Sequence, residues 1–341
     1  MNATPDTRPA ARSPAGFYGW WIVGLASLVG VLTGPGQSIG VSVFRQHLSD
    51  GLHLSDSAIA TAYLVGTLLS STLQPRIGRW VDQVGVRRAS TAFGIAFALA
   101  LAHMSMVRGV VWLAAGFFGI RLLGQGALSL TSTVAVMHWF DRRRGFALGL
   151  KMTLTMGGMS IVPILLAVAI DAWGWRIAWL AASAVIALTA VPVSWFGYVN
   201  RPADMGQLPD GEPPVHVGQL GSAPPSLTRS TALRSTAFWA LAAVTATNSL
   251  LGTGLLFHQT NLLGEIGYSN AQAAAMFLPQ AIGAVMGGLA FGWLSDRAAR
   301  PILPTVVALL LASTMLLGGT STTFPAVLLY TVVLGMTMGG G

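Results

Sequence analysis

The sequence has no cysteine and very little charge. Of its 341 residues, 9% are Asp, Glu, Lys or Arg and 53% are hydrophobic, whereas soluble domains carry about 25% charged residues. This shortage of charge argues against a soluble enzyme, a coiled coil or a disordered chain. Without cysteine the sequence can form no disulfide or thiolate metal site, and it shows no other metal-ligand spacing, phosphate-binding loop or dinucleotide-binding turn. We therefore expect no metal, no cofactor and no use of ATP.

Long apolar runs take the place of the missing charge, and they predict an all-α polytopic membrane protein. Strands of a membrane barrel would instead alternate over about ten residues. Ten runs bounded by charge, Pro or Gly are candidate membrane-spanning helices. They are Gly19–Phe44, Ser57–Ile77, Ala89–Val107, Val110–His138, Phe146–Ile170, Trp175–Val199, Ala237–Leu263, Ala271–Leu294, Ile302–Leu317 and Phe324–Gly341. The 41 Gly are expected at helix–helix contacts, because small residues let membrane helices approach closely.

The distribution of Lys and Arg predicts the orientation. With the N-terminus in the cytoplasm, fifteen of the 19 basic residues lie in inner segments, three in outer segments, and Arg121 lies inside a span. Such a bias is typical of the positive-inside rule, so we expect a cytoplasmic N-terminus in a bacterial inner or plasma membrane. The net charge of +8 then reflects topology, and the expected partner is the lipid bilayer, not a nucleic acid.

The polar stretches divide the chain into four parts. Residues 1–16 form a cytoplasmic tail, and 17–199 hold the first six spans. Residues 200–236 are rich in Pro, Gly and Ser, which is typical of a mobile linker, here expected on the cytoplasmic side. Residues 237–341 hold spans seven to ten, a second bundle that is incomplete if the first six helices are a repeated unit.

A short motif occurs after the second span of each half. The first copy runs from Gly78 through Asp82 and Gly85 to Arg87 and Arg88, and the second begins at Gly292 and continues through Asp296 and Arg297. Matching positions in two halves indicate a duplicated unit. We expect the first glycine of each copy to admit a neighbouring helix, the aspartates to cap a helix N-terminus, and the arginines to contact anionic headgroups.

These two copies resemble the loop signature of the major facilitator superfamily, Gly-x-x-x-Asp-(Arg/Lys)-x-Gly-x-Arg-(Arg/Lys). The first copy departs from it at Gln83, and the second is degraded after Arg297. The resemblance covers the whole chain. It implies two six-helix bundles that rock around a central cavity, and therefore a chain that lacks its last two helices. We expect a truncated protein or a fragment, unstable and without transport if the gene ends at Gly341.

Two further stretches are similar to the monocarboxylate and oxalate/formate transporter branch of that superfamily. One is Tyr18-Gly-Trp20-Trp21 at the start of the first span, where we expect the aromatic side chains to form an interfacial belt. The other precedes the fifth span and comprises Trp139, Phe140, Asp141, Arg142, Arg143, Arg144 and Gly145. The chain departs from the branch at Gln37, where a Lys is usual, and the eighth span has no ionisable residue. These departures argue against a simple monocarboxylate substrate.

Arg121 is the main candidate for chemistry inside the membrane, because a charge at that depth is costly. Its surroundings, Arg121-Leu-Leu-Gly-Gln125, are similar to the superfamily's helix-four element, which is associated with proton or anion coupling. The alternative is a structural Arg that binds Gln125 and nearby carbonyls. Lys151, close to a span end, is expected to extend to the headgroups. Four polar residues either orient a solute or hydrogen-bond neighbouring helices: Gln37, Asn248, His258 and Gln280.

The function that these features favour is transport of a small organic solute, with a carboxylate or other organic anion as one class, by alternating access. Arg121 would attract the negative charge. All eleven acidic residues lie in loops or at helix ends, so no carboxylate relay for protons is visible in the spans. Efflux of amphipathic drugs or metabolites is the alternative, and a non-transporting sensor or scaffold with the same fold is another. An enzyme is not expected, and no oligomer is required.

Overall fold

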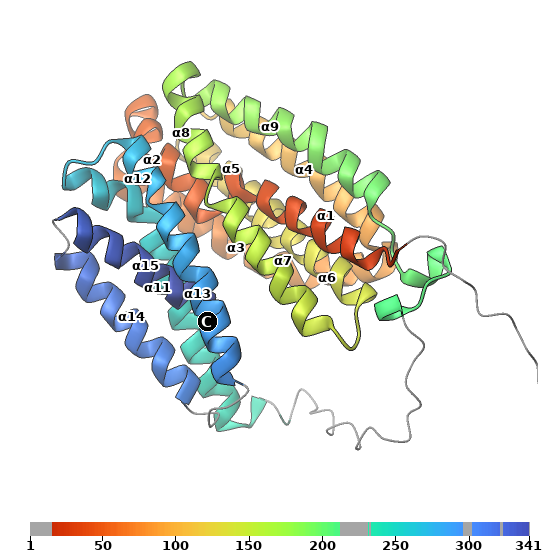
Figure 1. Cartoon of the computed structure of the whole chain (residues 1–341). Helices are drawn as coiled ribbons and strands as arrows, with labels where there is room; N and C mark the ends of the chain where they lie inside the picture. The colour runs from red at the N-terminus through yellow and green to blue at the C-terminus, as the bar shows by residue number, and fades with distance from the viewer. Residues whose placement is uncertain (1–15, 212–230, 232, 296–301, 321–322, 341) are drawn as a thin grey trace, which may run out of the picture.

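Two groups of helices make up the chain in its computed structural model, which describes residues 16–211, 231, 233–295, 302–320 and 323–340 (Figure 1). The N-terminal group comprises α1 (Gly19–Leu32), η1 (Gly34–Gly36), α2 (Ser38–Leu52), α3 (Asp56–Val84), α4 (Val86–Ser105), α5 (Val110–Ile120), η2 (Arg121–Leu128), α6 (Ser129–Trp139), α7 (Arg144–Met159), α8 (Val162–Trp173), α9 (Trp175–Pro192) and η3 (Val193–Gly197). The C-terminal group comprises α11 (Thr236–Glu265), α12 (Asn270–Ala275), α13 (Phe277–Ser295), α14 (Ile302–Thr320) and α15 (Phe324–Gly340). The short turns η4 (Pro202–Met205) and η5 (Pro209–Gly211) lie between them in sequence.

Four helical runs in the described part are long and apolar enough to cross a membrane: Val110–Trp139, Arg144–Trp173, Trp175–Gly197 and Phe238–Glu265. Three shorter helices are also apolar: Gly19–Leu32, Thr305–Gly319 and Phe324–Gly339. All seven coincide with predicted spans. The second span was placed too short, because α3 continues to Val84. Residues 78–82 of the first motif are therefore the last turns of a helix and not a loop.

Glycine and proline interrupt three of the predicted spans. The first span breaks at η1, a 3₁₀ turn of sequence Gly-Pro-Gly between α1 and α2, as expected for a Pro that cannot donate to the helix. The fifth span breaks between α7 and α8, where Pro163 occupies the first turn of α8. The eighth breaks at Met276, which separates α12 from α13.

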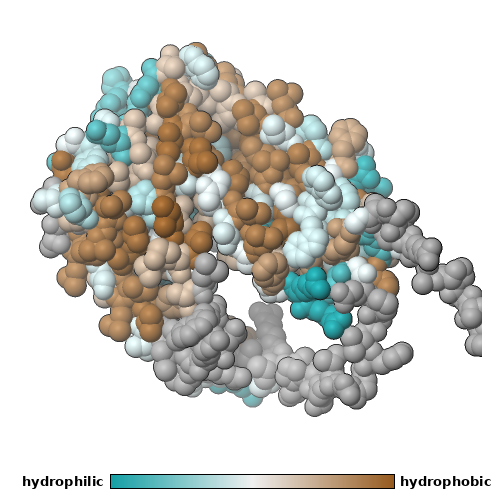
Figure 2. Space-filling model, in the orientation of Figure 1, coloured by the Kyte–Doolittle hydropathy of each residue, from teal (hydrophilic) through white to brown (hydrophobic). Residues whose placement is uncertain are grey.

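The large side chains of the N-terminal group divide into a buried core and an apolar outer surface. Trp139, Trp179 and Phe97 are fully buried. On the outside, Val111, Leu188 and Phe196 are each more than 75% exposed, and Figure 2 shows hydrophobic residues spread over the visible faces of both groups. Soluble proteins rarely expose apolar area on this scale, whereas a lipid environment accommodates it.

Helices α13 and α15 pack through glycine. A Cβ atom added to Gly335 would overlap the carbonyl oxygen of Gln280, and one at Gly283 would overlap that of Val332. A Cβ at Gly339 would overlap the carbonyl of Ala284. Backbones can approach this closely only where side chains are absent. The expected use of glycine at helix–helix contacts is confirmed for this pair.

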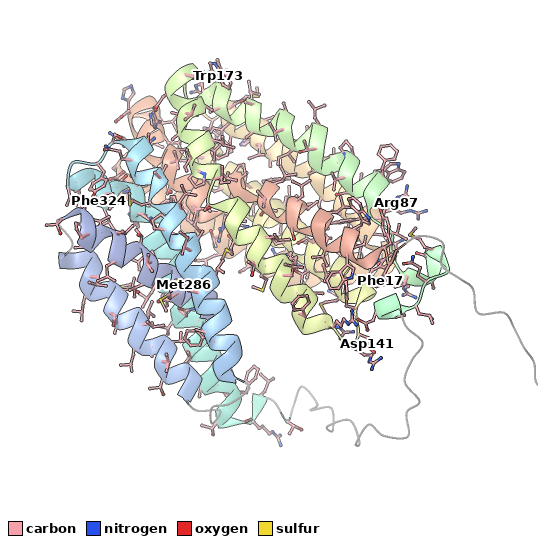
Figure 3. All side chains as sticks on the ribbon, in the orientation of Figure 1. Phe17, Arg87, Asp141, Trp173, Met286 and Phe324 are labelled. Atoms are coloured by element: carbon pink, nitrogen blue, oxygen red, sulfur yellow. The ribbon has the colours of Figure 1, made fainter. Side chains whose placement is uncertain are left out.

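The two groups meet near one end of the molecule and diverge toward the other (Figure 1). Where they meet, Thr260 Oγ1 of α11 donates to the Ser42 carbonyl of α2 over 2.9 Å, and the Tyr63 and Phe257 rings stack with centroids 4.4 Å apart. We call this end the far side. The opposite end is the N-terminal side, where Phe17, Arg87 and Asp141 lie, whereas Trp173 lies on the far side (Figure 3).

Candidate functional site

A cavity of about 360 Å³ lies between the two groups of helices. Its polar lining comes from both groups: Gln37, Ser38, Gln125, Asn248 and Gln280. Apolar side chains, including those of Leu256 and Phe277, complete the wall. A mostly apolar cavity with a few convergent polar groups is the usual form of a small-molecule site. Three of the five predicted solute-binding residues thus lie together: Gln37 between η1 and α2, Asn248 on α11 and Gln280 on α13.

Several of these amides have atoms without a partner. Gln125 Oε1, Asn248 Oδ1 and Gln280 Oε1 are buried, and among the described residues none of them forms a hydrogen bond. Gln37 Nε2 donates to Thr33 Oγ1 over 3.0 Å. Burying an amide oxygen without a partner is unfavourable, so a solute or water that reaches these atoms gains hydrogen bonds that the protein leaves open.

Arg121 lies beside the cavity and is connected to it by Ser38. Its side chain is 6% exposed, and its Nη1 lies 3.5 Å from Ser38 Oγ. The guanidinium carbon is 5.1 Å from the centre of the Tyr63 ring, and the Tyr63 hydroxyl is 2.8 Å from the same Ser38 oxygen. Arg121 Nε has no partner in the described part of the chain. The guanidinium is thus held by one hydroxyl and one ring, with no carboxylate paired to it among those residues.

The backbone around Arg121 is unusual. Arg121 begins η2, an eight-residue π-helix set between α5 and α6. Such wide turns are rare and are frequent at functional sites. Gly124 and Gly126 let the side chains of Phe97 and Gln74 lie against this segment. A Cβ at Gly124 would meet Phe97 at 2.6 Å, and one at Gly126 would overlap Gln74. The segment places Arg121 and Gln125 toward the space between the groups.

His258 does not line the cavity. It lies on α11 next to Phe257, with the two rings 5.1 Å apart, and Phe257 in turn stacks on Tyr63 at the far side. The predicted solute-orienting residues are thus separated, with Gln37, Asn248 and Gln280 in the cavity and His258 outside it. Ser38, which sequence reasoning missed, connects the cavity to Arg121.

Arg45 is a second buried cation. The sequence placed it in an outer segment just after the first predicted span, and the structure shows that α2 continues past it to Leu52. Arg45 is 4% exposed, and its Nη2 lies 2.9 Å from Asp56 Oδ2. Its guanidinium also lies 5.8 Å from the Phe257 ring. The pair closes the far side next to the contact between the two groups.

On the N-terminal side, the two aromatic motifs pack against each other. The ring of Tyr18 lies 5.5 Å from that of Trp139, and the ring of Trp20 lies 4.8 Å from that of Phe140. Trp139 Nε1 also donates to the Val199 carbonyl over 3.1 Å. Trp21 is 69% exposed and stays a candidate for the predicted aromatic belt, whereas the neighbouring rings join the start of α1 to the end of α6.

The first loop motif is held by the chain that follows α9. Gly85 has a φ of +84°, a conformation that favours glycine, and a Cβ there would meet Asn200 Oδ1 at 2.8 Å. That oxygen accepts from the Arg87 N–H over 3.0 Å. Arg87 Nε donates to the Trp195 carbonyl over 2.6 Å, and its guanidinium lies 4.8 Å from the Trp195 ring. Arg87 therefore binds protein, not the headgroups that we expected.

The remaining motif residues differ in part from expectation. Gly78 is not a close contact, because a Cβ there would meet only Leu130, at 4.0 Å. Asp82 is exposed and caps no helix among the described residues, while Arg88 is exposed. In the second copy Gly292 lies in α13, and Asp296 and Arg297 fall outside the described residues.

Asp210 corrects the prediction of a freely mobile linker over 200–236. Its Oδ2 accepts from the backbone N–H groups of Asp141 and Arg142 at 3.0 and 2.7 Å, and its Oδ1 accepts from that of Arg143 at 3.2 Å. A carboxylate in this position satisfies N–H groups that precede α7. Residues 200–211 are therefore bound to the motif that contains Arg142, Arg143, Arg144 and Gly145.

The same contacts set the pKa of Asp210. Burial alone would raise the pKa of this carboxyl, but the hydrogen bonds from Arg142, Asp141 and Arg143, with the charge of Arg143, bring it below its ordinary value. A depressed folded-state pKa gives stability that is present above the unfolded pKa of about 4 and is lost as the pH falls through the folded one. The segment 200–211 should therefore detach only in acid.

Asp210→Asn is expected to release this segment at every pH, since a neutral amide accepts these N–H groups less strongly; caps of this kind contribute about 1 kcal/mol. Hydrogen–deuterium exchange of residues 200–211, corrected for the intrinsic pH effect, should be fast in the variant at about pH 6 and in the parent only in acid below about pH 4, the ordinary pKa of Asp. Asp171→Asn, an exposed acid in the last turn of α8, is the control. Equal protection in parent and variant under the milder condition would contradict the role of Asp210.

Comparison with known proteins identifies the fold. Residues 22–341 match the model of the Major Facilitator Superfamily. The chain belongs to the major facilitator superfamily. Monocarboxylate transporter 13 of Bos taurus is 27% identical over 97% of this chain and 73% of its own length. Monocarboxylate transporter 11 of Mus musculus is 27% identical over 87% of this chain, and the match covers 63% of that relative.

Among solved structures, a bacterial homologue of the human lysosomal transporter Spinster, in an inward-facing and unoccupied conformation, has a TM-score of 0.69 at 14% identity. The match covers 96% of this chain and 74% of that one. The predicted superfamily, its major facilitator fold and the likeness to its monocarboxylate transporter branch are therefore confirmed. This superfamily member is a multi-pass membrane protein of a solute transporter family, and its cavity lies between the two bundles of that fold.

Proposed function

We propose that this major facilitator protein carries a small organic anion of the monocarboxylate class. The observation that supports the proposal is Arg121, a buried cation with no acidic partner among the described residues, beside a cavity with three unpaired amide oxygens. A charge that the protein leaves unpaired at mid-membrane is costly unless a ligand completes it. The names of the two monocarboxylate transporter relatives agree with this substrate class.

Arg121 would bind the carboxylate, and Ser38 would extend the polar path from it into the cavity. Gln37, Asn248 and Gln280 would hydrogen-bond the remainder of the solute. Gln37 is neutral, and the described part of α13 has no ionisable side chain. Neither position therefore supplies a second cation, and Arg121 alone would balance the substrate charge. These departures from the branch argue against a simple monocarboxylate, and the amides of the cavity suit a singly charged anion that has further polar groups, such as a hydroxycarboxylate.

Alternating access follows from the arrangement of the two bundles. Residues 17–199 and 237–341 would move as units, with 200–236 connecting them. The Ser42–Thr260 hydrogen bond and the Tyr63–Phe257 stack close the far side. By the positive-inside bias we place the N-terminal side in the cytoplasm, so the conformation described here is the one that opens inward. Breaking the far-side contacts and closing the N-terminal side would complete the cycle.

Counterflow in proteoliposomes tests the function. The full-length gene product is reconstituted with unlabelled glycolate, lactate or gluconate inside, and the labelled form of the same anion is added outside. Transient accumulation of at least one hydroxycarboxylate, without accumulation of labelled mannitol, is expected. Absence of carboxylate counterflow would overturn the proposal. In that case, export of amphipathic compounds would favour efflux, and carboxylate binding without counterflow would favour the sensor.

A further inference from the structure

Lys151 is a third buried cation, and the transport function proposed above gives it no role. Sequence reasoning expected its ammonium group to reach the headgroups, and this is wrong: the side chain is 6% exposed, and its Nζ donates to Thr133 Oγ1 of α6 over 3.3 Å. The lysine therefore points into the bundle. No carboxylate pairs with it among the residues that the structure describes.

A stripe of polar residues connects Thr133 to Arg121. Arg121, Gln125, Ser129 and Thr133 follow one another at four-residue intervals along η2 and α6 and line a groove of about 480 Å³. Ser70, Ser71 and Gln74 of α3 form the opposite wall. Gln125 borders both this groove and the central cavity. Groove and cavity are thus adjacent, and Arg121 stands where they meet.

The two cations stand near opposite ends of this stripe. Thr133 lies six residues before the end of α6 on the N-terminal side, about 9 Å along a helix that rises 1.5 Å per residue. Arg121 lies twelve residues further in, beyond the start of α6 and at the opposite end of η2. Of these two buried cations, a solute from the N-terminal side thus meets the lysine first and the arginine second.

An ammonium ion that is buried with a single hydroxyl partner is poorly compensated. Its three N–H donors need acceptors, and its positive charge attracts anions into a groove whose walls have low dielectric constant. A structural lysine in this position would be expected to pair with an acid, and the described part of the chain provides none. A mobile anion in the groove satisfies both requirements.

We propose that Lys151 is an anion-capture site at the N-terminal mouth of the transport path, from which a carboxylate moves along the Thr133–Ser129–Gln125 stripe to Arg121. This inference rests on the proposed function for its substrate. Its electrostatic part stands independently, because the groove should concentrate anions whether or not the protein transports them.

The 341 residues contain no cysteine, so a thiol introduced among them is the only one that they hold. Ser129→Cys, midway along the stripe, is made in the full-length protein in proteoliposomes. The rates at which an anionic and a cationic methanethiosulfonate modify this groove thiol are compared. In the parent background the ratio of anionic to cationic rate should be well above that of Ala203→Cys, an exposed position on η4. Adding Lys151→Gln should lower the ratio for the groove thiol by about tenfold and leave it unchanged for the η4 thiol.

Two further measurements keep the outcome decisive. Lys151→Arg retains the charge and should preserve the ratio, which separates loss of charge from misfolding. Lactate at about 100 mM, well above a typical transporter or enzyme KM, should slow modification of the groove thiol, and Lys151→Gln should weaken this protection. If Lys151→Gln leaves the ratio unchanged while the parent shows counterflow, the capture site is wrong and the proposed function stands. If the ratio falls but no carboxylate is carried, the groove binds anions and the transport proposal fails.

Discussion

Arg121→Ala is expected to lower carboxylate counterflow by about a hundredfold or more. Removing one partner of a buried, hydrogen-bonded charge pair costs about 2–5 kcal/mol, and about 1.4 kcal/mol corresponds to a factor of ten. Here the pair is Arg121 and the substrate carboxylate, with no described acid to take the substrate's place. The alanine variant also loses the contacts to Ser38 and to the Tyr63 ring, so an empty polar space would replace the binding group.

Two variants make this result specific. Arg121→Lys retains the charge but loses the planar group that lies over Tyr63, and it should retain an intermediate rate with weaker apparent affinity. Arg108→Ala removes an exposed arginine between α4 and α5 and should transport like the parent. Initial rates of labelled lactate or glycolate counterflow are measured at equal protein density. Unchanged flux in Arg121→Ala, with a monodisperse elution profile, would assign Arg121 a purely structural role.

Gly335→Ile should unfold the C-terminal bundle. The Gly335 backbone touches the Gln280 carbonyl of α13, and a branched side chain there can be accepted only if the two helices separate. Overpacked cores lose about 1–3 kcal/mol when side chains can move aside; here the obstacle is backbone, so the loss should reach at least about 3 kcal/mol. Because Gln280 lines the cavity, the solute site should be lost with the packing.

The matched control is Gly319→Ile, on the exposed face of α14, where a Cβ would meet no atom within 4 Å. Both variants are heated in detergent, and the fraction that remains monodisperse is measured by fluorescence-detected size exclusion. The Gly335 variant should aggregate at least about 10 °C lower than the control. Similar aggregation temperatures of the two variants would contradict this prediction, because they would show that α13 and α15 can separate without loss of stability.

The helices were predictable because a membrane-spanning helix needs a long run of apolar residues, which is visible in the sequence. The ends were less so, because α2 and α3 extend beyond their apolar stretches into polar residues. Arg45 is the clearest example, because its ion pair with Asp56 and its contact with Phe257 of the other bundle cannot be inferred from local sequence. Asp210 is similar, as it lies in a Pro- and Gly-rich stretch and is ordered only by the N–H groups of the segment before α7.

The cavity was predictable in part. Gln37, Asn248 and Gln280 were chosen because they are polar positions on the first and second helices of each half, and all three line the cavity. Gln125 follows Arg121 by four residues and could have been included on that spacing. Lys151 was assigned wrongly, and His258 lies outside the cavity, because the direction in which a side chain faces depends on neighbouring helices, and one sequence does not reveal how α11 or α7 is rotated.

If Arg121 is the substrate-binding cation that we propose, its unpaired charge would also make transport sensitive to voltage. With the N-terminal side in the cytoplasm, the empty site of the inward-open state would share the electrical potential of the cytoplasm; after reorientation it would share that of the outside. Moving one elementary charge through the full potential corresponds to about 2.3 kcal/mol per 100 mV. A negative interior would then hold the empty, positively charged site in the inward-open state. A bound monocarboxylate would cancel the charge of Arg121, so the loaded protein would reorient with little electrical work, and the return of the empty site would become the step that membrane potential controls.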